Sequence, residues 1–387
     1  MKDIFVTESV KYVGVDDTDI DLFESQYPVP NGISYNSYVI MDEKIAIMDT
    51  VDRRKTDEWL ANVDEALEGR LPDYLVVHHM EPDHAGNIQI LCKKFPNMKI
   101  VANKKLIAML PQFFDMDFSE KLIEVGEGDT LSLGKHTLTF VMAPMVHWPE
   151  AMVSYESADK ILFSADGFGK FGALSCDEDW TCEARRYFIN IVGKYGAQVQ
   201  ALLKKAAGLD IAIICPLHGP ILKENLGYYI EKYDIWSSYR PEDEGVLIAY
   251  GSIHGHTAAA AKKMAEILTA KGCPKVVVCD LARDSMSEAI EDAYRYSKLI
   301  IASATYDANL FPCVEDYVYH LKIKNFQKRK VGIIQNGSWA PAAGKLLKEA
   351  FEKMKDITIC ETMVDIRSAM KQSNIAEMEA LADEILA

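Results

Sequence analysis

The chain has 387 residues, of which 42 are Lys or Arg and 58 are Asp or Glu, giving a formal net charge of −16. An acidic chain without a basic cluster is a poor partner for nucleic acid, and no apolar stretch approaches the ~20 residues that cross a bilayer. The N-terminus lacks a signal-peptide core, so we expect a cytoplasmic protein. At about 150 residues per domain, this length favours two domains over one.

The eight cysteines are scattered along the chain, and none forms a CxxC pair of the kind that binds metal in small modules. We therefore expect no rubredoxin module fused to this chain. Cys215 and Cys279 lie in apolar runs, where cysteine usually acts as a small buried hydrophobic residue. This use of cysteine agrees with the expected compartment.

In the first 240 residues, short apolar runs alternate with segments of helical periodicity. The runs at 38–41 and 45–48 flank three polar residues and predict a hairpin, and residues 126–142 alternate like a second hairpin around a turn that contains His136. We assign His136 no chemical role. Further strands are predicted at 74–77, 99–102, 160–165 and 210–214, and helices at 55–67, 85–95, 104–110 and about 179–206. This mixture predicts a two-sheet α/β sandwich.

The pattern breaks at residues 239–245, where a proline, three acids and Gly245 separate two apolar blocks. We place a domain boundary there, which gives domains at 1–240 and 245–387. Beyond it, five apolar strands are each followed by a helical stretch. The predicted strands are 246–250, 275–279, 298–302, 330–334 and 357–361. Near-continuous apolar strands that alternate with helices predict a doubly wound parallel sheet.

The most specific motif is His79-Met80-Glu81-Pro82-Asp83-His84, which follows an apolar strand and precedes a predicted helix. It holds four possible metal ligands within six residues. In a loop, alternate side chains need not diverge, so His79 and Glu81 can reach one metal while Asp83 and His84 reach a second. Each pair is incomplete, and other strand ends must supply the remaining ligands.

Three further candidates each lie close to the end of an apolar run, namely His147, Asp166 and His218. Loops at strand ends are where an α/β scaffold presents functional side chains. Asp166 has two carboxylate oxygens and suits a bridge between two cations. Glu81 contributes an anionic oxygen that stabilises ferric iron, whereas a neutral imidazole in its place would suit zinc. The donor set therefore favours a metal pair that changes oxidation state.

The order HxExDH, His, Asp, His over roughly the first 220 residues resembles the metallo-β-lactamase fold. It resembles in particular the flavodiiron proteins, in which Glu replaces the second His of the hydrolase pattern HxHxDH. The resemblance implies a metallo-β-lactamase-like αββα sandwich with two irons. It implies that one iron is bound by His79, Glu81 and His147, the other by Asp83, His84 and His218, and that Asp166 bridges them.

A second motif follows the strand that ends at Tyr250. Its residues are Ser252, Ile253, His254, Gly255, His256 and Thr257, ahead of an alanine-rich helix. A loop of small residues and hydroxyls at a helix N-terminus presents backbone N–H groups and the positive end of the helix dipole to a phosphate. The spacing is neither GxGxxG nor a Walker loop, so a dinucleotide or nucleoside triphosphate is not indicated.

This Ser-x-x-Gly-x-Thr loop resembles the phosphate site of flavodoxin-like domains, and the implied cofactor is FMN. Such domains contact the flavin ring from the loops after the third and fourth strands. In this chain those loops hold Ser303, Ala304, Thr305, Tyr306, Asp307, Asn309, Asn336, Gly337, Ser338, Trp339 and Ala340. We expect Tyr306 and Trp339 to stack on or edge the ring, and Thr305, Asn309 and Gly337 to form hydrogen bonds with it.

Together, the two resemblances imply a flavodiiron oxidoreductase that reduces O2 to water, NO to N2O, or both. Reduction of O2 to two waters takes four electrons, which a diferrous pair and a fully reduced flavin supply together. The electrons would come from a separate small protein such as rubredoxin. Because the motifs lie in different predicted domains, the family implies a head-to-tail homodimer, or a tetramer, in which each flavin faces the partner's metal site.

Three other interpretations remain open. The seven candidate ligands could be unrelated helix caps and core histidines. The chain could be a binuclear zinc hydrolase with a flavodoxin-like appendage, although Glu81 argues against it. It could also be an electron carrier or regulatory module with a degenerate metal site, although no expected ligand is missing. The preference between O2 and NO, the natural donor and the flavin potential depend on features that spacing does not reveal.

Overall fold

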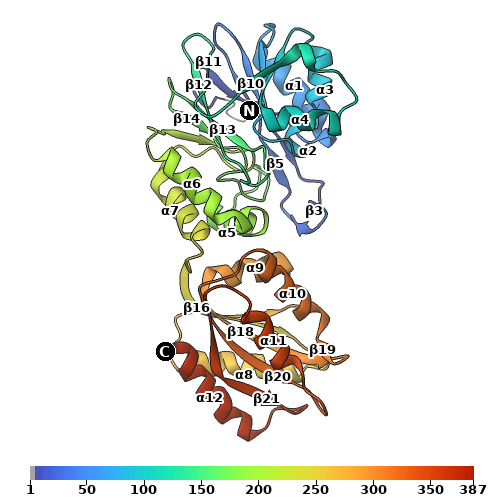
Figure 1. Cartoon of the computed structure of the whole chain (residues 1–387), viewed down its shortest axis with the longest axis vertical. Helices are drawn as coiled ribbons and strands as arrows, with labels where there is room; N and C mark the ends of the chain where they lie inside the picture. Colours follow the sequence, from blue (N-terminus) through green and yellow to red (C-terminus); the bar gives the residue numbers. More distant parts are fainter. Residues whose placement is uncertain (1–4) are drawn as a thin grey trace. The chain divides into compact units, whose positions relative to one another are not determined.

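The computed structural model describes residues 5–387 and divides the chain into two compact units (Figure 1). The first unit extends to Phe188 and resumes over Ala197–Asp234, and the second comprises Ile189–Gly196 and Ile235–Ala387. Within residues 5–387, no helix has both the length and the apolar character needed to cross a membrane.

The first unit contains two sheets. The order of the first sheet is β1 (Val10–Tyr12), β6 (Tyr38–Ile40), β7 (Ala46–Met48), β8 (Tyr74–Val76), β9 (Lys99–Asn103) and β10 (Leu122–Val125). The predicted hairpin is the antiparallel pair β6–β7, and β7 to β10 pair in parallel. Two short ribbons accompany this sheet, β2 (Val15–Asp17) with β5 (Ile33–Tyr35) and β3 (Leu22–Phe23) with β4 (Tyr27–Pro28).

The second sheet of this unit is largely an antiparallel meander. Its order is β11 (Thr130–Ser132), β12 (Thr137–Met142), β13 (Met152–Glu156), β14 (Ile161–Phe163) and β15 (Ile213–Cys215), with only β14 and β15 parallel. Inward-facing side chains of both sheets form one buried cluster that includes Met48, Val76, Phe140 and Phe163. Removing this apolar surface from water, at about 25 cal/mol per Å², holds the sheets face to face.

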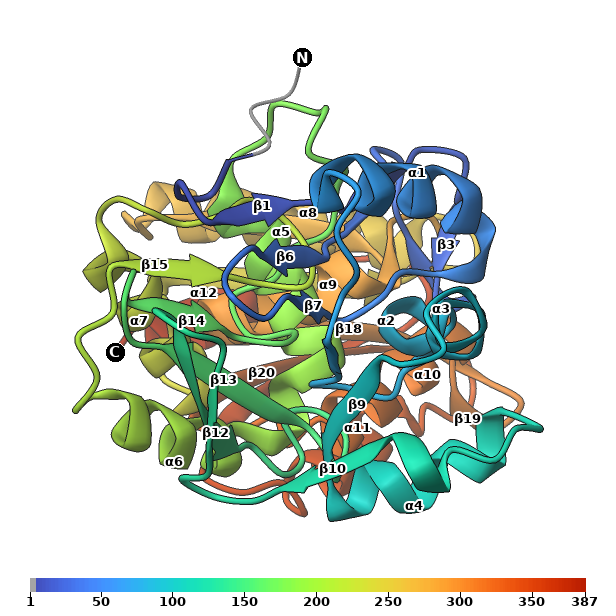
Figure 2. The ribbon, with the colours of Figure 1, turned by 90° about the horizontal axis from the view of Figure 1, so that it is seen from above.

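Helices cover the outer faces of both sheets, which confirms the predicted αββα sandwich. The helices grouped with the first sheet are α1 (Thr56–Leu67), α2 (Pro82–Ala85), α3 (Ile88–Lys94) and α4 (Lys104–Phe113), with short 3₁₀ turns at Arg53–Lys55 and Ser119–Lys121. Figure 2 shows α4 beside β9 and β10, and the helix contacts both strands. The helices beside the second sheet are α5 (Trp180–Tyr187), α6 (Gly196–Ala206) and α7 (Leu226–Ser237).

The prediction of one continuous helix over about 179–206 was wrong. A π-helical segment at Phe188–Val192 and a 3₁₀ turn at Gly193–Tyr195 separate α5 from α6. The Tyr239 hydroxyl donates to the Gly193 carbonyl at 2.8 Å and accepts the Gly196 N–H at 3.1 Å. Because these contacts occupy backbone groups at the interruption, tertiary structure overrides a pattern that is locally helical.

The second unit is a parallel sheet in the order β17 (Val276–Asp280), β16 (Asp243–Gly251), β18 (Tyr296–Tyr306), β20 (Arg329–Asn336) and β21 (Ile357–Ile366). β19 (Asn309–Leu310) pairs with the end of β18. The helices are α8 (His256–Ala270), α9 (Met286–Arg295), α10 (Pro312–Ile323), α11 (Ala343–Phe351) and α12 (Gln372–Leu386). Figure 1 shows α8 and α12 on one face of the sheet and α9 and α10 on the other. This confirms the flavodoxin-like prediction.

Candidate metal centre and flavin site

Local structure presents the first four metal-ligand candidates in one loop and one helical turn. β8 ends at Val76, and α2 begins at Pro82, whose fixed φ suits the first helical position. Glu81 therefore precedes the helix with an extended backbone (φ −58°, ψ 138°), while Asp83 and His84 lie inside its first turn. The N–H and the hydroxyl of Thr50 both donate to the His84 carbonyl at 2.8 Å, which anchors the turn.

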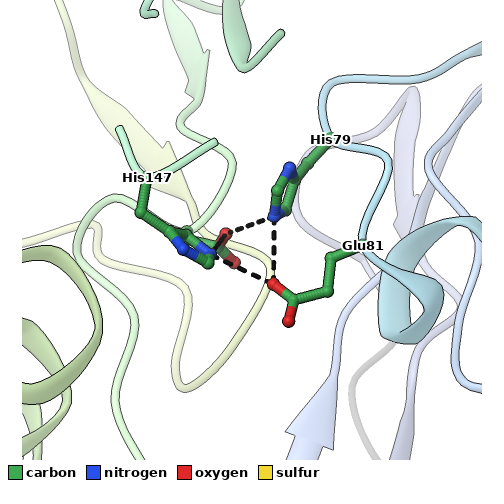
Figure 3. Close-up of side chains that lie close together, drawn as sticks. His79, Glu81 and His147 are labelled. Carbon is green, nitrogen blue, oxygen red and sulfur yellow. Dashed lines mark hydrogen bonds and ion pairs between the residues drawn. The ribbon is translucent and has the colours of Figure 1, made fainter. Parts of the chain in front are cut away.

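The structure brings His79, Glu81, His147 and Asp166 into one group of mutually close donor atoms. His79 Nε2 and His147 Nε2 each lie 3.1 Å from Glu81 Oε2. The same two nitrogens lie 3.4 and 3.2 Å from Asp166 Oδ2. Figure 3 shows His79 and Glu81, from the loop between β8 and α2, and His147, from a second loop, pointing toward one another.

Asp83, His84 and His218 form a second group beside the first. His84 Nε2 and His218 Nε2 face each other at 3.0 Å, and each lies 3.3 Å from Asp83 Oδ2. Asp166 contacts this group through its other oxygen, since Oδ1 is 3.2 Å from His84 Nε2 and 3.7 Å from His218 Nε2. Asp166 thus lies between the two groups, with one oxygen directed to each.

Two of the imidazoles are oriented by hydrogen bonds on their far sides. His79 Nδ1 lies 2.9 Å from Glu150 Oε1, which also accepts the Met80 N–H at 2.9 Å. His218 Nδ1 donates to the Ser34 carbonyl at 2.7 Å. Because an acceptor fixes the proton on Nδ1, each Nε2 is left with its lone pair directed at the group. Such partners are characteristic of metal-binding histidines.

The donor set fits a pair of metal ions. Donor atoms about 2.1 Å from a shared ion lie roughly 3.0–3.5 Å apart, which is close to the separations found in both groups. Both carboxylate oxygens of Asp83 and of Asp166, and Nε2 of His147, are buried and have no hydrogen-bond partner among residues 5–387. Buried polar atoms in a folded protein normally have partners, so these atoms fit cations that would supply them.

The electrostatics of the groups agree with this reading. Burial lowers the pKa of His147, but the carboxylates of Asp166 and Glu81 outweigh it and raise the pKa to about 9. Burial, together with the negative charges of Glu81 and Asp166, raises the pKa of Asp83 to about 7 against the attraction of His84. Carboxylates and imidazoles packed this closely compete for protons, and cations would remove the competition.

Three neighbouring residues, His78, Trp148 and Glu150, complete the surroundings of the metal groups. His78 lies 2.6 Å from Asp49 through Nδ1 and 2.8 Å from Ser154 through Nε2, so both ring nitrogens are used away from the metal groups. Trp148 meets the His79 ring edge to face at 5.1 Å between centroids and walls the first group. Glu150 gave no signal because it lies in a loop with no periodicity.

In the second unit, a cavity of about 650 Å³ opens where the β16–α8 loop meets the loops after β18 and β20. This volume is ample for a flavin mononucleotide. The predicted residues that line it are Ser252, Ile253, His254, His256, Thr257, Ala304, Thr305, Tyr306, Asp307, Asn336, Gly337, Ser338, Trp339 and Ala340. Ala308 and Ser368 also line it and were missed, although Ser368 follows β21 at the same sheet edge, where the switch-point rule could have found it.

The start of α8 fits a phosphate. No side chain caps this 15-residue helix, so its first N–H groups remain available to an anion. Gly255 at the cap has φ +88°, which L-residues rarely adopt. Asn336 donates to the Ser368 carbonyl at 2.9 Å and to the Thr257 hydroxyl at 3.3 Å, which joins three of the loops around the cavity.

The structure does not bring every predicted flavin contact to this cavity. Gly255, Ser303 and Asn309 are not among its lining residues. Ser303 is fully buried in β18 and its hydroxyl accepts the Phe311 N–H, while the Asn309 amide donates to Glu315 at 3.1 Å. Thr305 lines the cavity, and its hydroxyl accepts the backbone N–H groups of residues 342 and 343 at 2.9 and 3.1 Å, which ties it to the start of α11.

Comparisons with known proteins agree with this architecture. A family model described as ODP family beta lactamase matches residues 33–219. The flavodiiron protein of Giardia intestinalis superimposes with a TM-score of 0.90 at 25% identity, covering 98% of this chain and 95% of that one. The chain belongs to the flavodiiron protein family. The rubredoxin oxygen:oxidoreductase of Desulfovibrio gigas is similar to this flavodiiron protein with a TM-score of 0.91 at 26% identity, over 98% and 97% of the two chains.

Two relatives extend the similarity in sequence. An uncharacterized protein of Methanocaldococcus jannaschii is 30% identical over 377 residues, which is 96% of this chain and 94% of the relative. A nitric oxide reductase of Moorella thermoacetica is 29% identical and covers 92% of each chain. The similarity therefore extends over both units of this flavodiiron protein.

Proposed function

We propose that this flavodiiron protein is an oxidoreductase that reduces O2 to water, NO to N2O, or both, at a pair of irons supplied with electrons through FMN. The observation that carries the proposal is the arrangement of seven donor residues in two groups, with one oxygen of Asp166 directed to each. A zinc hydrolase would need no anionic oxygen at position 81, so Glu81 favours a redox pair over hydrolysis.

In this proposal, one iron is bound by His79, Glu81 and His147, the other by Asp83, His84 and His218, and Asp166 bridges them. When bound, the irons would supply the electrons and the binding positions for the gas, while FMN would accept electrons from a donor protein. Glu150 and the Ser34 carbonyl hold two imidazoles in the required tautomer before any ion arrives. The protein thus binds the ions with little rearrangement.

A route for the gas lies beside the ligands. A small cavity of about 260 Å³ is lined by Phe23, Arg54, Glu81 and Asp83, among others, and lies in the first unit. It brings solvent to one side of Glu81 while the histidine ligands stay buried. We propose that O2 or NO enters there, because no other ligand in the two groups is as exposed as Glu81.

We propose that FMN binds in the cavity of the second unit, with its phosphate at the N-terminus of α8. Tyr306 and Trp339 are 44% and 92% exposed at the rim, where they can edge the ring. An exposed aromatic rim also leaves the flavin edge open to another protein. On this basis we propose a small electron donor such as rubredoxin, as named in one structural neighbour, and a head-to-tail homodimer or tetramer.

We also propose that the protein resides in a reducing compartment such as the cytoplasm. Cys92, Cys215, Cys279 and Cys360 are buried free thiols. Burial raises the pKa of Cys92 and Cys360 to about 11, so these two thiols stay protonated near neutral pH. Cytoplasmic proteins commonly keep cysteine in this form.

The test is gas consumption by the reduced, iron-loaded and FMN-loaded protein. The protein is reduced without oxygen and mixed with O2 or with NO, and gas loss and hydrogen peroxide are measured. We expect at least one gas to be consumed without peroxide, because a flavin acting alone would release peroxide from O2. Asp166→Asn, with FMN content unchanged, should lose at least about 100-fold of the rate. Equal rates for both proteins would refute the proposal.

A further inference from the structure

A third cluster of potential ligands lies in the first unit, away from the two groups above. His136, Glu156 and Asp159 bring their donor atoms within 4.8 Å of one another. His136 precedes β12, Glu156 ends β13, and Asp159 lies in the turn to β14. Because these strands are antiparallel, the cluster lies at one end of the sheet, whereas His147 and Asp166 follow its opposite end. Strand rise separates the two ends by roughly 15–20 Å.

The His136 ring is fixed from behind by Asp42. Asp42 Oδ2 accepts the backbone N–H of His136 at 2.7 Å and lies 2.8 Å from its Nδ1. Nδ1 therefore carries a proton, and Nε2 is left to face Asp159 Oδ2 at 3.5 Å. The residue is only 1% exposed, and Nε2 has no hydrogen-bond partner within residues 5–387. A carboxylate on one nitrogen and oxygen donors at the other are the surroundings of a metal-binding histidine.

The oxygens of this cluster are held in place by the chain. Glu156 is fully buried, and its two oxygens accept backbone N–H groups of the following turn at 2.6 and 2.8 Å. Asp159 Oδ2 accepts the Thr7 hydroxyl at 2.6 Å, while the neighbouring Lys160 is paired with Asp210. Two carboxylates beside one imidazole are costly to bury unless a cation compensates them.

We propose that His136 Nε2, Glu156 and Asp159 bind a divalent cation of the zinc class, with solvent completing the coordination. One imidazole and two carboxylates are donors that Zn²⁺ accepts. The Asp159 side chain is 20% exposed, which gives the ion a route from solvent. Bound there, the ion joins the hairpin turns before β12 and after β13 to the segment around Thr7, so its role is structural. The proposal does not depend on the gas chemistry.

The first test is a titration of the iron-loaded, FMN-loaded protein with zinc chloride against a competing chelator. Iron is counted before and after, so that exchange of iron for zinc is recognised. We expect one Zn²⁺ per chain beyond the iron and a rise in Tm of several degrees. Asp159→Asn should weaken this binding at least about 10-fold and remove the rise. Asp64→Asn, which removes the same charge from an exposed pair with Lys94, should behave as the unaltered protein.

The second test locates the ion without a variant. Crystals grown with zinc chloride are measured at the zinc absorption edge. An anomalous peak bonded to His136 Nε2 supports the proposal. Zinc found only at the seven ligands or on the surface, or equal zinc affinity in Asp159→Asn, would overturn it.

Discussion

The metal region and the flavin region of this flavodiiron protein are built in opposite ways. His79, His84 and His218 are completely buried, and the rings of His79 and His218 are oriented by hydrogen bonds on their far sides. In the flavin region, Trp339 is 92% exposed and the walls enclose a broad, open cavity. The comparison teaches that neighbouring residues fix the proposed metal ligands in advance, whereas the proposed flavin contacts lie at an open cavity with an exposed rim.

The difference follows from the size and charge of what is bound. A metal ion binds tightly only when its ligand atoms lie within a few tenths of an ångström of the ideal metal–ligand distance of about 2 Å. Buried side chains that are held by hydrogen bonds supply that precision. A flavin spreads its contacts over many atoms and is held by backbone N–H groups at a helix end, so a loop is sufficient. Substitutions in the two regions should therefore have separable effects on iron and on FMN.

The largest effect is expected for Glu81→His. The substitution restores the imidazole of the hydrolase pattern and removes an anionic donor, so metal content should shift from iron toward zinc. Gas reduction should fall by at least about 100-fold, while FMN content stays that of the unaltered protein. Metal analysis, flavin absorbance and gas consumption check this. Full activity with two irons in the variant would contradict the assignment of Glu81 as a ligand. It would also contradict the contrast between the metal region and the flavin region.

Glu150→Gln tests whether Glu150 positions His79 in the metal region. The amide can still accept the Met80 N–H, but it no longer presents a negative charge to His79 Nδ1. Iron affinity and gas reduction should fall by about 10–100-fold with FMN unchanged. Glu68→Gln, at a side chain that is 67% exposed, is the matched control and should leave iron affinity unaltered. The same iron affinity in both variants would show that Glu150 does not position His79.

Gly255→Ala tests the flavin side. Gly255 has φ +88° and a Cβ there would meet no atom within 4 Å, so the cost is in the backbone alone, about 1–2 kcal/mol. FMN affinity should fall about 10-fold because the phosphate loop is distorted. Gly272→Ala has the same kind of strain at φ +84°, again with no atom within 4 Å, at the other end of α8. It should lower stability without changing FMN affinity, and iron should be unaltered in both.

The smallest effect is expected for Trp339→Ala. Because the side chain is almost entirely exposed, the free energy of unfolding should change by no more than about 0.5 kcal/mol. FMN affinity should fall only a few-fold, since an exposed ring contact is worth about 1 kcal/mol. Trp59→Ala, at a fully buried tryptophan of the first unit, should instead cost about 3–5 kcal/mol of stability. Chemical denaturation and flavin titration separate the two outcomes.

The directions of individual side chains in the flavin region could not be predicted from the sequence, because their partners share no common pattern. The Asn309 amide donates to Glu315, and the Thr305 hydroxyl accepts backbone N–H groups at the start of α11. Both were placed near a flavin by motif position, which fixes the loop but not the rotamer. A side-chain direction depends on which neighbour offers a partner, and that neighbour is known only after folding.

The sequence by itself determined the two kinds of layered sheet, because apolar periodicity reports which faces are buried. It also indicated seven metal-ligand candidates, because four of them form one compact motif, the other three lie close to the ends of predicted strands, and all carry suitable donor atoms. Tertiary structure alone decided that Asp166 lies between both groups, that Glu150 orients His79, and that His136 meets Glu156 and Asp159. These contacts join separate loops, and only the packing of the sheets sets the distance between loops.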